Sequence, residues 1–315
     1  MKRYQQRVGQ SMQIPQSGRR QLITSEFSEL ARFQAGKRRQ YQQLKPGRLQ
    51  AGYLESNGRG VQIFRETLSI SARIEAQPGE QRLPFAVILP HSGEFRFCGQ
   101  TRQGPQLVQA VGGQWDISFQ ERLDYLCIAL DREVFLQSAV PRLGVEAEDL
   151  SLNLGLQACR PSELAQFAIE LRQLLDQPSE SLQHQGVEAL VKVLAGRCQP
   201  ASLVRSPARR IEGARRVMAY LEEYARELPD MARLCQIAGM SERSLEYGFR
   251  DSIGVSPNHY LKLVRLNGAR GELLTGQGSV AAIAMNWGFL ELGRFAGEYR
   301  RHFGELPSQT LRGAT

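Results

Sequence analysis

The sequence predicts an α+β protein with a β-rich N-terminal domain and an all-α C-terminal domain. Its 315 residues are too many for one ordinary domain and suit two. From about residue 52 to residue 138, short runs of alternating apolar and polar residues are separated by turn residues, which is typical of an antiparallel barrel or sandwich. After Pro141 the spacing of apolar residues lengthens towards 3.6, the period of an α-helix.

Five apolar runs mark expected strands of the first domain, at residues 61–64, 68–72, 85–89, 95–97 and 115–119. Turn residues interrupt the chain at 58–60, 78–79, 92–93 and 112–113. Alternation predicts that Phe95 and Phe97 share one strand face and that Trp115, Ile117 and Phe119 share another. The aromatic side chains among them are candidates for lining a ligand-binding interior, and ordinary core packing is the alternative interpretation.

Helices close the first domain. Apolar residues at helical spacing predict amphipathic helices at 161–175 and 183–197, whose apolar faces could pack against a symmetry mate. Residues 199–207 predict an interdomain linker in which Ser206 caps the next helix and Pro207 begins it. The expected organisation is a basic segment at 1–50 that packs on or leads into the first domain, the first domain at 51–198, the linker at 199–207 and a second domain at 208–315.

The second domain contains two similar stretches about fifty positions apart, at residues 234–241 and 283–290. In the first stretch, Gly239 marks a turn that needs positive φ, and Ser241 is the expected N-cap of the helix that follows. Leu245 and Phe249 form an apolar stripe on that second helix, facing Leu234 on the first. This spacing predicts a helix-turn-helix unit, which is a DNA-binding motif.

The second stretch predicts a second helix-turn-helix unit with its turn at Gly288. Its inward residues are Val280, Ile283 and Trp287 on the first helix and Phe295, Tyr299 and Phe303 on the second. A linker helix that begins at Ser256 and Pro257 and ends before Gly276 joins the two units. A helix of about 20 residues is about 30 Å long, close to the roughly 34–36 Å between successive major-groove faces of B-DNA.

These motifs identify a family resemblance: residues 208–313 resemble the DNA-binding domain of AraC/XylS-family bacterial transcription regulators. The matching residues include Leu234, Ala238, Gly239, Met240, Ser241, Leu245, Phe249, Gly254, Ser256, Pro257, Tyr260, Gly288, Phe289, Phe295, Tyr299, Phe303, Gly304 and Pro307. The resemblance implies a cupin-like N-terminal barrel that binds a small-molecule effector or dimerises. It also implies a homodimer that binds promoter DNA and activates transcription by recruiting RNA polymerase.

The resemblance places base contacts on the first recognition helix at Arg243, Glu246 and Tyr247. Arginine can bond guanine, glutamate can accept from cytosine, and tyrosine can contact a thymine methyl or a phosphate. A surface ion pair between Arg243 and Glu246 is the alternative. On the second helix only Arg294 can bond strongly, because its neighbours are Leu292, Gly293, Ala296 and Gly297. The second unit is therefore expected to act through Arg294, through apolar contact with thymine methyls and through the close backbone approach that Gly293 and Gly297 allow. It is expected to position the protein more than it specifies sequence.

Phosphate contacts are expected from a hydroxyl and several cations, and the candidates are Ser241, Arg250, Lys262, Arg300 and Arg301. Solvated surface charge is the alternative for each arginine. Trp287 and the Phe stripe are expected in the core. The net charge is +8, yet residues 207–315 carry 15 basic and 12 acidic residues, so charge alone does not identify the DNA-binding domain.

The first sixty residues hold 12 basic and 3 acidic residues. This segment, with Arg19, Arg20 and residues 37–39, is interpreted either as a second nucleic-acid contact or as a solvated arm. No stretch of about 18 apolar residues or signal-peptide pattern occurs, so a cytoplasmic location is expected.

The sequence argues against an enzyme. His91 is the only histidine in the barrel region and is expected in a turn, so no metal site or cofactor is predicted. Cys98, Cys127, Cys159, Cys198 and Cys235 lack ligand spacing, which favours free thiols and leaves a redox sensor as the alternative. Two other interpretations stay open: a DNA-alkyl-transfer repair protein, and a ligand-free first domain that serves only dimerisation or protein contacts.

Overall fold

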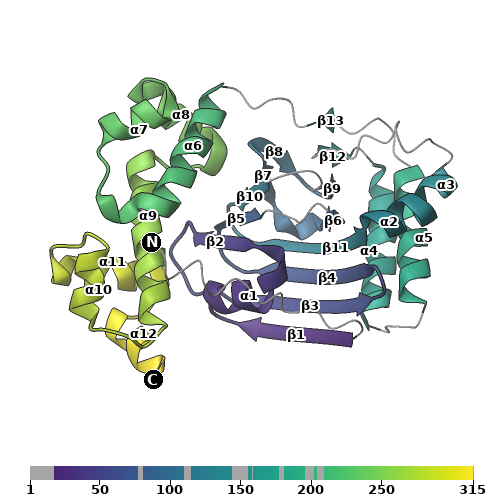
Figure 1. The fold of residues 1–315 in the computed structure, drawn as a ribbon, viewed down its shortest axis with the longest axis horizontal. Coiled ribbons are helices and arrows are strands. Elements are labelled where there is room, and N and C mark those ends of the chain that lie inside the picture. The colour runs from purple at the N-terminus through teal and green to yellow at the C-terminus, as the bar shows by residue number, and fades with distance from the viewer. Residues whose placement is uncertain are drawn as a thin grey trace.

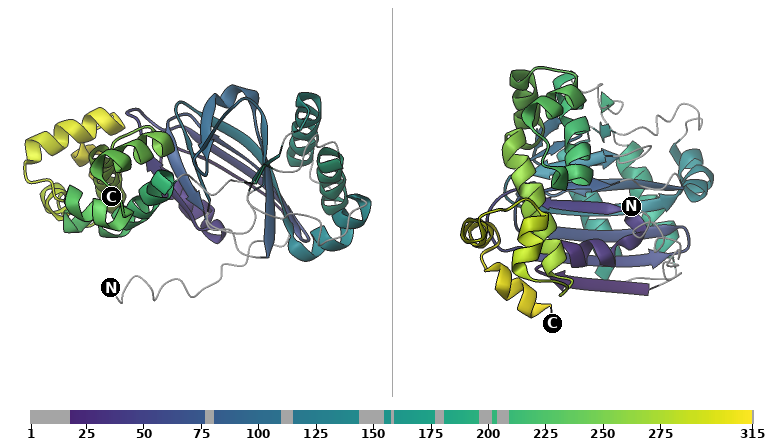
Figure 2. Two further views of the ribbon diagram at one scale, coloured as in Figure 1. Left: turned by 90° about the horizontal axis from the view of Figure 1, so that it is seen from above. Right: turned by 60° about the vertical axis from the view of Figure 1, so that its left-hand side comes forward.

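The computed structural model describes residues 18–76, 81–109, 115–143, 155–157, 159–176, 181–195, 202–203 and 209–314. They form layers that are visible in Figures 1 and 2: a helical pair, a large β-sheet, a small β-sheet and a helical C-terminal domain. All strand pairings are antiparallel, so the predicted α+β class with an N-terminal barrel or sandwich is confirmed. The expected breaks at 78–79 and 112–113 and most of the linker lie outside the described residues.

The eight-stranded sheet has the order β1-β3-β4-β11-β6-β9-β12-β13. Its strands are β1 (Gly18–Thr24), β3 (Ala51–Gly58), β4 (Val61–Leu68), β6 (Arg82–Ile88), β9 (Gln106–Gln109), β11 (Leu123–Asp131), β12 (Gly155–Gln157) and β13 (Ser202–Leu203). The five-stranded sheet has the order β2-β5-β10-β7-β8. Its strands are β2 (Arg39–Gln43), β5 (Ala72–Ala76), β7 (Glu94–Phe97), β8 (Gln100–Gln103) and β10 (Trp115–Phe119).

One prediction about these strands is wrong, and another is confirmed. Residues 68–72 are not one strand, because β4 ends at Leu68, the chain bends, and β5 begins at Ala72. The residues predicted to share a face within β7 and within β10 do so. Phe97 pairs with Ile117 and Phe95 with Phe119, so register places all of them on the face that meets the large sheet. Alternation within one strand cannot reveal which strand will be its neighbour.

The large sheet is apolar on both faces, and its two faces build two separate cores. Ile63, Phe85 and Leu126 point towards the helices α4 (Pro161–Asp176) and α5 (Leu182–Ala195). Phe64, Ala86 and Cys127 point towards the small sheet. The apolar faces of α4 and α5 pack on the large sheet, so the expectation that those faces meet a symmetry mate is wrong.

The described part of the basic N-terminal segment, residues 18–50, is part of the barrel. β1, helix α1 (Phe27–Phe33) and β2 all belong to it, with a 3₁₀ turn, η2 (Ala35–Lys37), between α1 and β2. Arg39 has a side chain only 5% exposed and pairs with Glu66. Lys37 lies over the ring of Phe64, 3.2 Å from its centroid. Neither a nucleic-acid contact nor a solvated arm describes Lys37 and Arg39, because both cations are held among barrel carboxylates and aromatic rings.

Short helical segments complete the first domain: η3 (Pro90–Ser92), α2 (Arg132–Val134), a π-helical turn η4 (Phe135–Ala139) and α3 (Val140–Leu143). The C-terminal domain contains α6 (Arg209–Tyr224), η5 (Ala225–Glu227), α7 (Met231–Ala238), α8 (Glu242–Ile253), α9 (Pro257–Leu273), α10 (Val280–Asn286), α11 (Leu292–Phe303) and α12 (Pro307–Gly313). Among the described residues, none of the helices combines the length and the hydropathy needed to cross a membrane.

Candidate nucleic-acid interface

The first helix-turn-helix unit consists of α7 and α8. Gly239 ends α7 at φ 66°, in the left-handed region predicted for it. Ser241 then caps α8, where its hydroxyl accepts from the Ser244 amide at 3.4 Å. Leu234, Leu245 and other apolar residues of this unit pack with α6 and α9 in one core. The sequence therefore predicted this unit correctly, including its caps.

The second unit consists of α10 and α11 and has its own core. Gly288 follows α10 at φ 79°, as predicted. Ile283, Phe295, Tyr299 and Phe303 pack against α9 in that core. Trp287 is half-buried and contacts both cores, while its indole donates to Glu272 Oε2 at 2.7 Å. Its structural role agrees with the prediction that it belongs to the core.

Helix α9 joins the units and differs little from the expected linker helix. Ser256 caps it by accepting from the His259 amide at 3.3 Å, and Pro257 is its first residue. Its 17 residues span about 25 Å at 1.5 Å per residue. Figure 1 shows α9 running between the two units, with α7 and α8 near one end and α10 and α11 near the other.

The predicted base-contacting residues of α8 lie on its outer side. Arg243 and Tyr247 are exposed, and Glu246 is half-buried. The Arg243 guanidinium lies 5.8 Å from the centroid of the Tyr247 ring, and among the described residues it makes no ion pair with Glu246. The alternative ion-pair interpretation is therefore wrong for this conformation. On α11, Arg294 is 71% exposed and reaches Glu298 Oε1 at 3.5 Å.

The predicted phosphate-contacting residues fall into two groups. Arg250, Arg300 and Arg301 are exposed on the recognition helices. Lys262 on α9 is half-buried, and its Nζ lies 3.6 Å from Glu298 Oε1. An exposed cation keeps its hydration and can exchange a counterion for a phosphate, whereas Lys262 must also leave Glu298.

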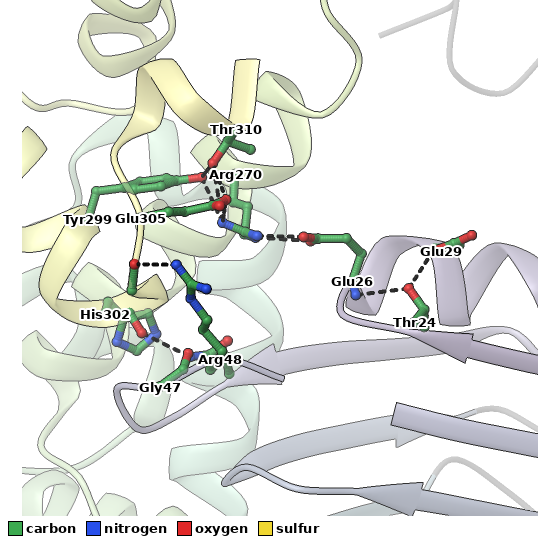
Figure 3. A network of polar contacts seen from close by, with 12 residues as sticks. Thr24, Glu26, Glu29, Gly47, Arg48, Arg270, Tyr299, His302, Glu305 and Thr310 are labelled. Carbon is green, nitrogen blue, oxygen red and sulfur yellow. Dashed lines mark hydrogen bonds and ion pairs between the residues drawn. The ribbon is translucent and has the colours of Figure 1, made fainter. Parts of the chain in front are cut away.

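Sequence patterns did not reveal that the first domain holds the C-terminal ends of both recognition helices. The Ser118 hydroxyl donates to the carbonyl of Ser252, in the last turn of α8, at 3.1 Å. At the end of α11, the amide of Gly47 donates to the carbonyl of His302 at 2.9 Å. Arg48 donates to the carbonyl of Gly304 at 3.1 Å (Figure 3). Cations and amide donors at these positions satisfy carbonyls that a helix end leaves unpaired.

Helix α9 is tied to the first domain by a network centred on Arg270 (Figure 3). The Arg270 guanidinium donates to Glu26 at 3.0 Å and to Glu305 at 2.9 Å. It also reaches the Tyr299 hydroxyl at 3.1 Å. Its side chain is only 14% exposed, so removing either carboxylate would leave a poorly solvated charge.

A second charged cluster joins the small sheet to α6. Arg73 on β5 bonds Glu222 at 2.6 Å and lies 3.5 Å from Asp116 on β10. Asp116 also pairs with Arg215. Arg73 and Asp116 are about 5% exposed, which makes these contacts part of a closed interface between the domains. No sequence pattern indicates either network, because the partners that belong to different domains lie about 100 to 240 residues apart.

A small cavity lies between the two sheets. Trp115, Phe97 and Ile117 line it, together with Arg39. Of the residues predicted to line a ligand site, Phe95 and Phe119 lie elsewhere in the closed core. Within the part of the chain that the structure describes, Arg39 Nε and Trp115 Nε1 are buried without a hydrogen-bond partner. Burial, together with the neighbouring Arg39 charge, holds the pKa of Lys37 well below its usual range.

The structure offers little for catalysis within the described residues. No cluster of three His, Cys, Asp or Glu side chains is arranged to hold a metal there. His91 lies in the predicted turn, with Nε2 2.6 Å from Asp124. Burial raises the pKa of Cys98 to about 11 and that of Cys127 to about 12, so both thiols stay protonated and unreactive at neutral pH. Cys198 lies outside the described residues.

Comparison with known proteins agrees with this architecture. A family model described as a helix-turn-helix domain matches residues 234–313. The "Probable thc operon regulatory protein" of Rhodococcus erythropolis is 32% identical over 201 residues, which are 59% of this chain and 60% of that protein. The "XylDLEGF operon transcriptional activator" of Pseudomonas putida is 41% identical over 100 residues, 31% of each chain.

Among solved structures, a probable AraC family transcriptional regulator from Rhodopseudomonas palustris CGA009 is 37% identical. It covers 33% of this chain and 97% of its own, with a TM-score of 0.32. The AraC-like transcriptional activator CuxR is 12% identical over 79% of this chain and 94% of its own, with a TM-score of 0.43.

The C-terminal geometry defines a double helix-turn-helix domain. Together with the sequence matches, it shows that the chain belongs to the AraC/XylS family of bacterial transcriptional regulators. The curated relatives are regulators and not enzymes. The chain spans less than two thirds of the length of the relatives cited above.

Proposed function

We propose that this protein binds promoter DNA sequence-specifically, with α8 and α11 in two successive major grooves, and thereby activates transcription. The observation that carries the proposal is the pair of recognition helices, equal in length and exposed on their outer sides, that one helix joins. Arg243, Glu246, Tyr247 and Arg294 are the proposed base contacts. The proposed phosphate contacts are Ser241, Arg250, Lys262, Arg300 and Arg301.

Selection from a random duplex pool with the full chain tests this proposal. We expect one enriched motif with two conserved blocks about one helical turn apart, protected together in a footprint. Binding measured by fluorescence anisotropy at fixed salt should be at least ~10³-fold tighter for that motif than for shuffled DNA. A pool that yields no motif, or equal affinity for motif and shuffled duplexes, would contradict sequence-specific binding.

We further propose that a small molecule in the cavity between the sheets controls DNA binding. Two unpaired buried donors, Arg39 Nε and Trp115 Nε1, favour a ligand that carries hydrogen-bond acceptors on an apolar body. The small sheet separates this cavity from the DNA-binding domain. On β10, Trp115 faces the cavity while the next residue, Asp116, contacts Arg215 of α6. A ligand that moves β10 would therefore act on the interdomain contacts directly.

A thermal-shift screen of small acceptor-bearing molecules tests this effector site. A compound that binds there should raise Tm for the natural chain and raise it less for Trp115→Phe, which keeps an aromatic ring but removes the donor. Equal stabilisation of both proteins would place the compound elsewhere. A screen without any stabilising compound supports the alternative, in which the first domain serves only dimerisation or protein contacts.

Assembly and polymerase contact complete the proposed function. We expect a homodimer, as the family resemblance implies, and a contact with RNA polymerase at the promoter. Light scattering at micromolar concentration measures the first expectation, and transcription from a promoter that carries the selected motif measures the second. A monomer at all concentrations would contradict the dimer, and lowered transcription would make the protein a repressor.

A further inference from the structure

The two recognition helices can be compared residue by residue. Both have 12 residues, α8 from Glu242 to Ile253 and α11 from Leu292 to Phe303. Both end at a glycine in the left-handed region, with φ of 79° at Gly254 and 78° at Gly304. Inner residues correspond as well, because Leu245 matches Phe295 and both are buried. An offset of fifty residues therefore aligns the two outer faces without a gap.

The aligned outer faces differ in chemistry. Where α8 has Glu242, Arg243, Glu246 and Tyr247, α11 has Leu292, Gly293, Ala296 and Gly297. Each of these four polar side chains is replaced by an apolar side chain or by none, whereas Ser244 aligns with Arg294 and Arg250 with Arg300. Leu292 is an apolar side chain that is 43% exposed at the start of the helix. Burial of such a residue requires a partner outside the domain.

The two glycines create space and not tight packing. A Cβ added to Gly293 or to Gly297 would have no heavy atom within 4 Å. Glycine inside a helix costs about 0.5–1 kcal/mol relative to alanine, so neither glycine stabilises this fold. In contrast, Gly248 of α8 lies against α6, where an added Cβ would come within 2.2 Å of the Arg210 carbonyl oxygen. Because these two positions of α11 carry no side chain, a binding partner can approach the helix backbone closely.

We propose that α11 recognises thymine by its C5-methyl groups. Leu292 and Ala296 would supply the apolar contacts, and Gly293 and Gly297 would allow the close approach. The inference rests on the proposed function, because it needs α11 in a major groove. The thymine methyl is the apolar group that distinguishes base pairs on the major-groove edge. Exposed Arg294, Arg300 and Arg301 surround this apolar stripe with positive charge, which complements the phosphates on both sides of a groove.

A protein partner is the competing occupant of this stripe, since exposed leucine also suits a protein interface. DNA and a protein partner can be distinguished by experiment, because only DNA recognition depends on the thymine methyl. Deoxyuridine pairs like thymidine and lacks only that methyl, so it is a suitable probe. Loss of one buried methyl should weaken binding about fourfold.

The experiment uses the full chain and the duplex obtained by selection. The half-site at which Arg243→Ala relaxes base preference defines the contact of α8, and the other half-site belongs to α11. Thymidines of each half-site are replaced by deoxyuridine one at a time, and Kd is measured at fixed salt. We expect one or more positions in the α11 half-site to weaken binding about fourfold each.

Two variants connect the methyl effect to this helix. Leu292→Ala should abolish the deoxyuridine effect in the α11 half-site, whereas Leu290→Ala, an equal truncation of a leucine that is 82% exposed before the helix, should retain it. Gly297→Ala should raise the Tm of the protein and yet weaken binding to the α11 half-site, because one methyl fills the approach space. A purely structural role for this glycine cannot produce opposite signs.

The outcomes separate this inference from the proposed function. A selected motif whose α11 half-site tolerates deoxyuridine at every thymidine, or retains the effect in Leu292→Ala, overturns thymine recognition and leaves sequence-specific binding intact. The same result would assign the apolar stripe to a protein partner. If no motif is selected at all, both the proposed function and this inference fail.

Discussion

The two helix-turn-helix units have the same backbone plan and opposite surfaces. In each, a glycine with positive φ follows the first helix, and a 12-residue recognition helix that ends at glycine comes next. The first recognition helix exposes Arg243 and Tyr247, and the second exposes Leu292, Gly293 and Gly297 at the aligned positions or beside them. A duplicated scaffold can therefore keep its inner packing while its outer face changes from hydrogen bonding to close apolar approach.

The two helices also differ at one covered position, because α6 packs on the first unit. Gly248 allows the backbone of α6 to lie directly on α8. The aligned position on α11 is Glu298, which is half-buried and is reached by Lys262 and Arg294. Glycine has thus been used for two purposes, internal contact in the first unit and external approach in the second.

The largest expected effect on stability comes from adding a side chain at Gly248, where α6 lies against α8. Gly248→Ala places a methyl 2.2 Å from the Arg210 carbonyl oxygen, and the backbone on either side must move. We expect a loss of about 3 kcal/mol in the free energy of unfolding of the C-terminal domain. Urea denaturation followed by circular dichroism measures it. Gly297→Ala is the matched control, and it should stabilise by about 0.5–1 kcal/mol; equal effects of the two variants would disprove the distinction.

The second comparison concerns the anchored ends of the helices. Ser252 on α8 aligns with His302 on α11, and only the latter can titrate. Burial lowers the pKa of His302 from 6.5 to about 4, with a smaller contribution from the positive charges of Lys262 and Arg270. The folded protein therefore disfavours the protonated ring. Stability should be complete above pH 6.5 and fall as pH drops towards 4, by about 3 kcal/mol in all.

A substitution can assign this loss of stability at acid pH to His302 of the second unit. Most of the loss, about 2 kcal/mol, is expected between pH 6.5 and pH 5, before most carboxylates titrate. In His302→Ser, which copies the first unit, the unfolding free energy should change less over that window, and the change that remains is expected from His259, whose pKa burial also lowers. Denaturation at several pH values measures both proteins. Identical pH profiles for the two would refute the assignment to His302.

Local features of this comparison were predictable from sequence, and interdomain features were not. Gly239, Ser241 and Ser256 determine turns and caps by their own backbone preferences, so their positions followed from neighbouring residues alone. The exposure of Arg243 and Tyr247 followed from helical periodicity. Strand partners did not, so the pairing of β7 with β10, which sets Phe97 opposite Ile117, could not be predicted.

The charged residues show most clearly what a sequence pattern cannot predict. Lys37 and Arg39 lie in a basic run that is typical of a solvated segment, yet their aliphatic stems and charges are enclosed by residues of distant strands. Arg270 and Glu26 are 244 residues apart in the chain and form one ion pair. A charge pattern indicates how many cations exist in a segment and not which carboxylates the fold will bring to them.

Specific DNA binding should depend most on the first unit. Arg243→Ala removes a side chain that is free to bond a guanine edge, and we expect a loss of about 1–3 kcal/mol on the selected motif with relaxed preference at one base pair. The affinity for shuffled duplex should change little. Anisotropy titrations on both duplexes measure the difference. An equal loss on both would show that Arg243 contacts phosphate and not a base.

The smallest losses of DNA affinity are expected where the two recognition helices carry the same exposed residue. Arg250 and Arg300 occupy aligned positions, and both are exposed. A phosphate contact by either arginine carries no sequence information, so alanine at each should weaken selected and shuffled DNA alike, by about 1 kcal/mol. The slope of log Kd against log salt concentration should fall by about 1 in each variant. A normal slope in Arg300→Ala with a reduced slope in Arg250→Ala would mean that α11 does not approach a phosphate at this position. The backbone symmetry of the two units would then not extend to their placement on DNA.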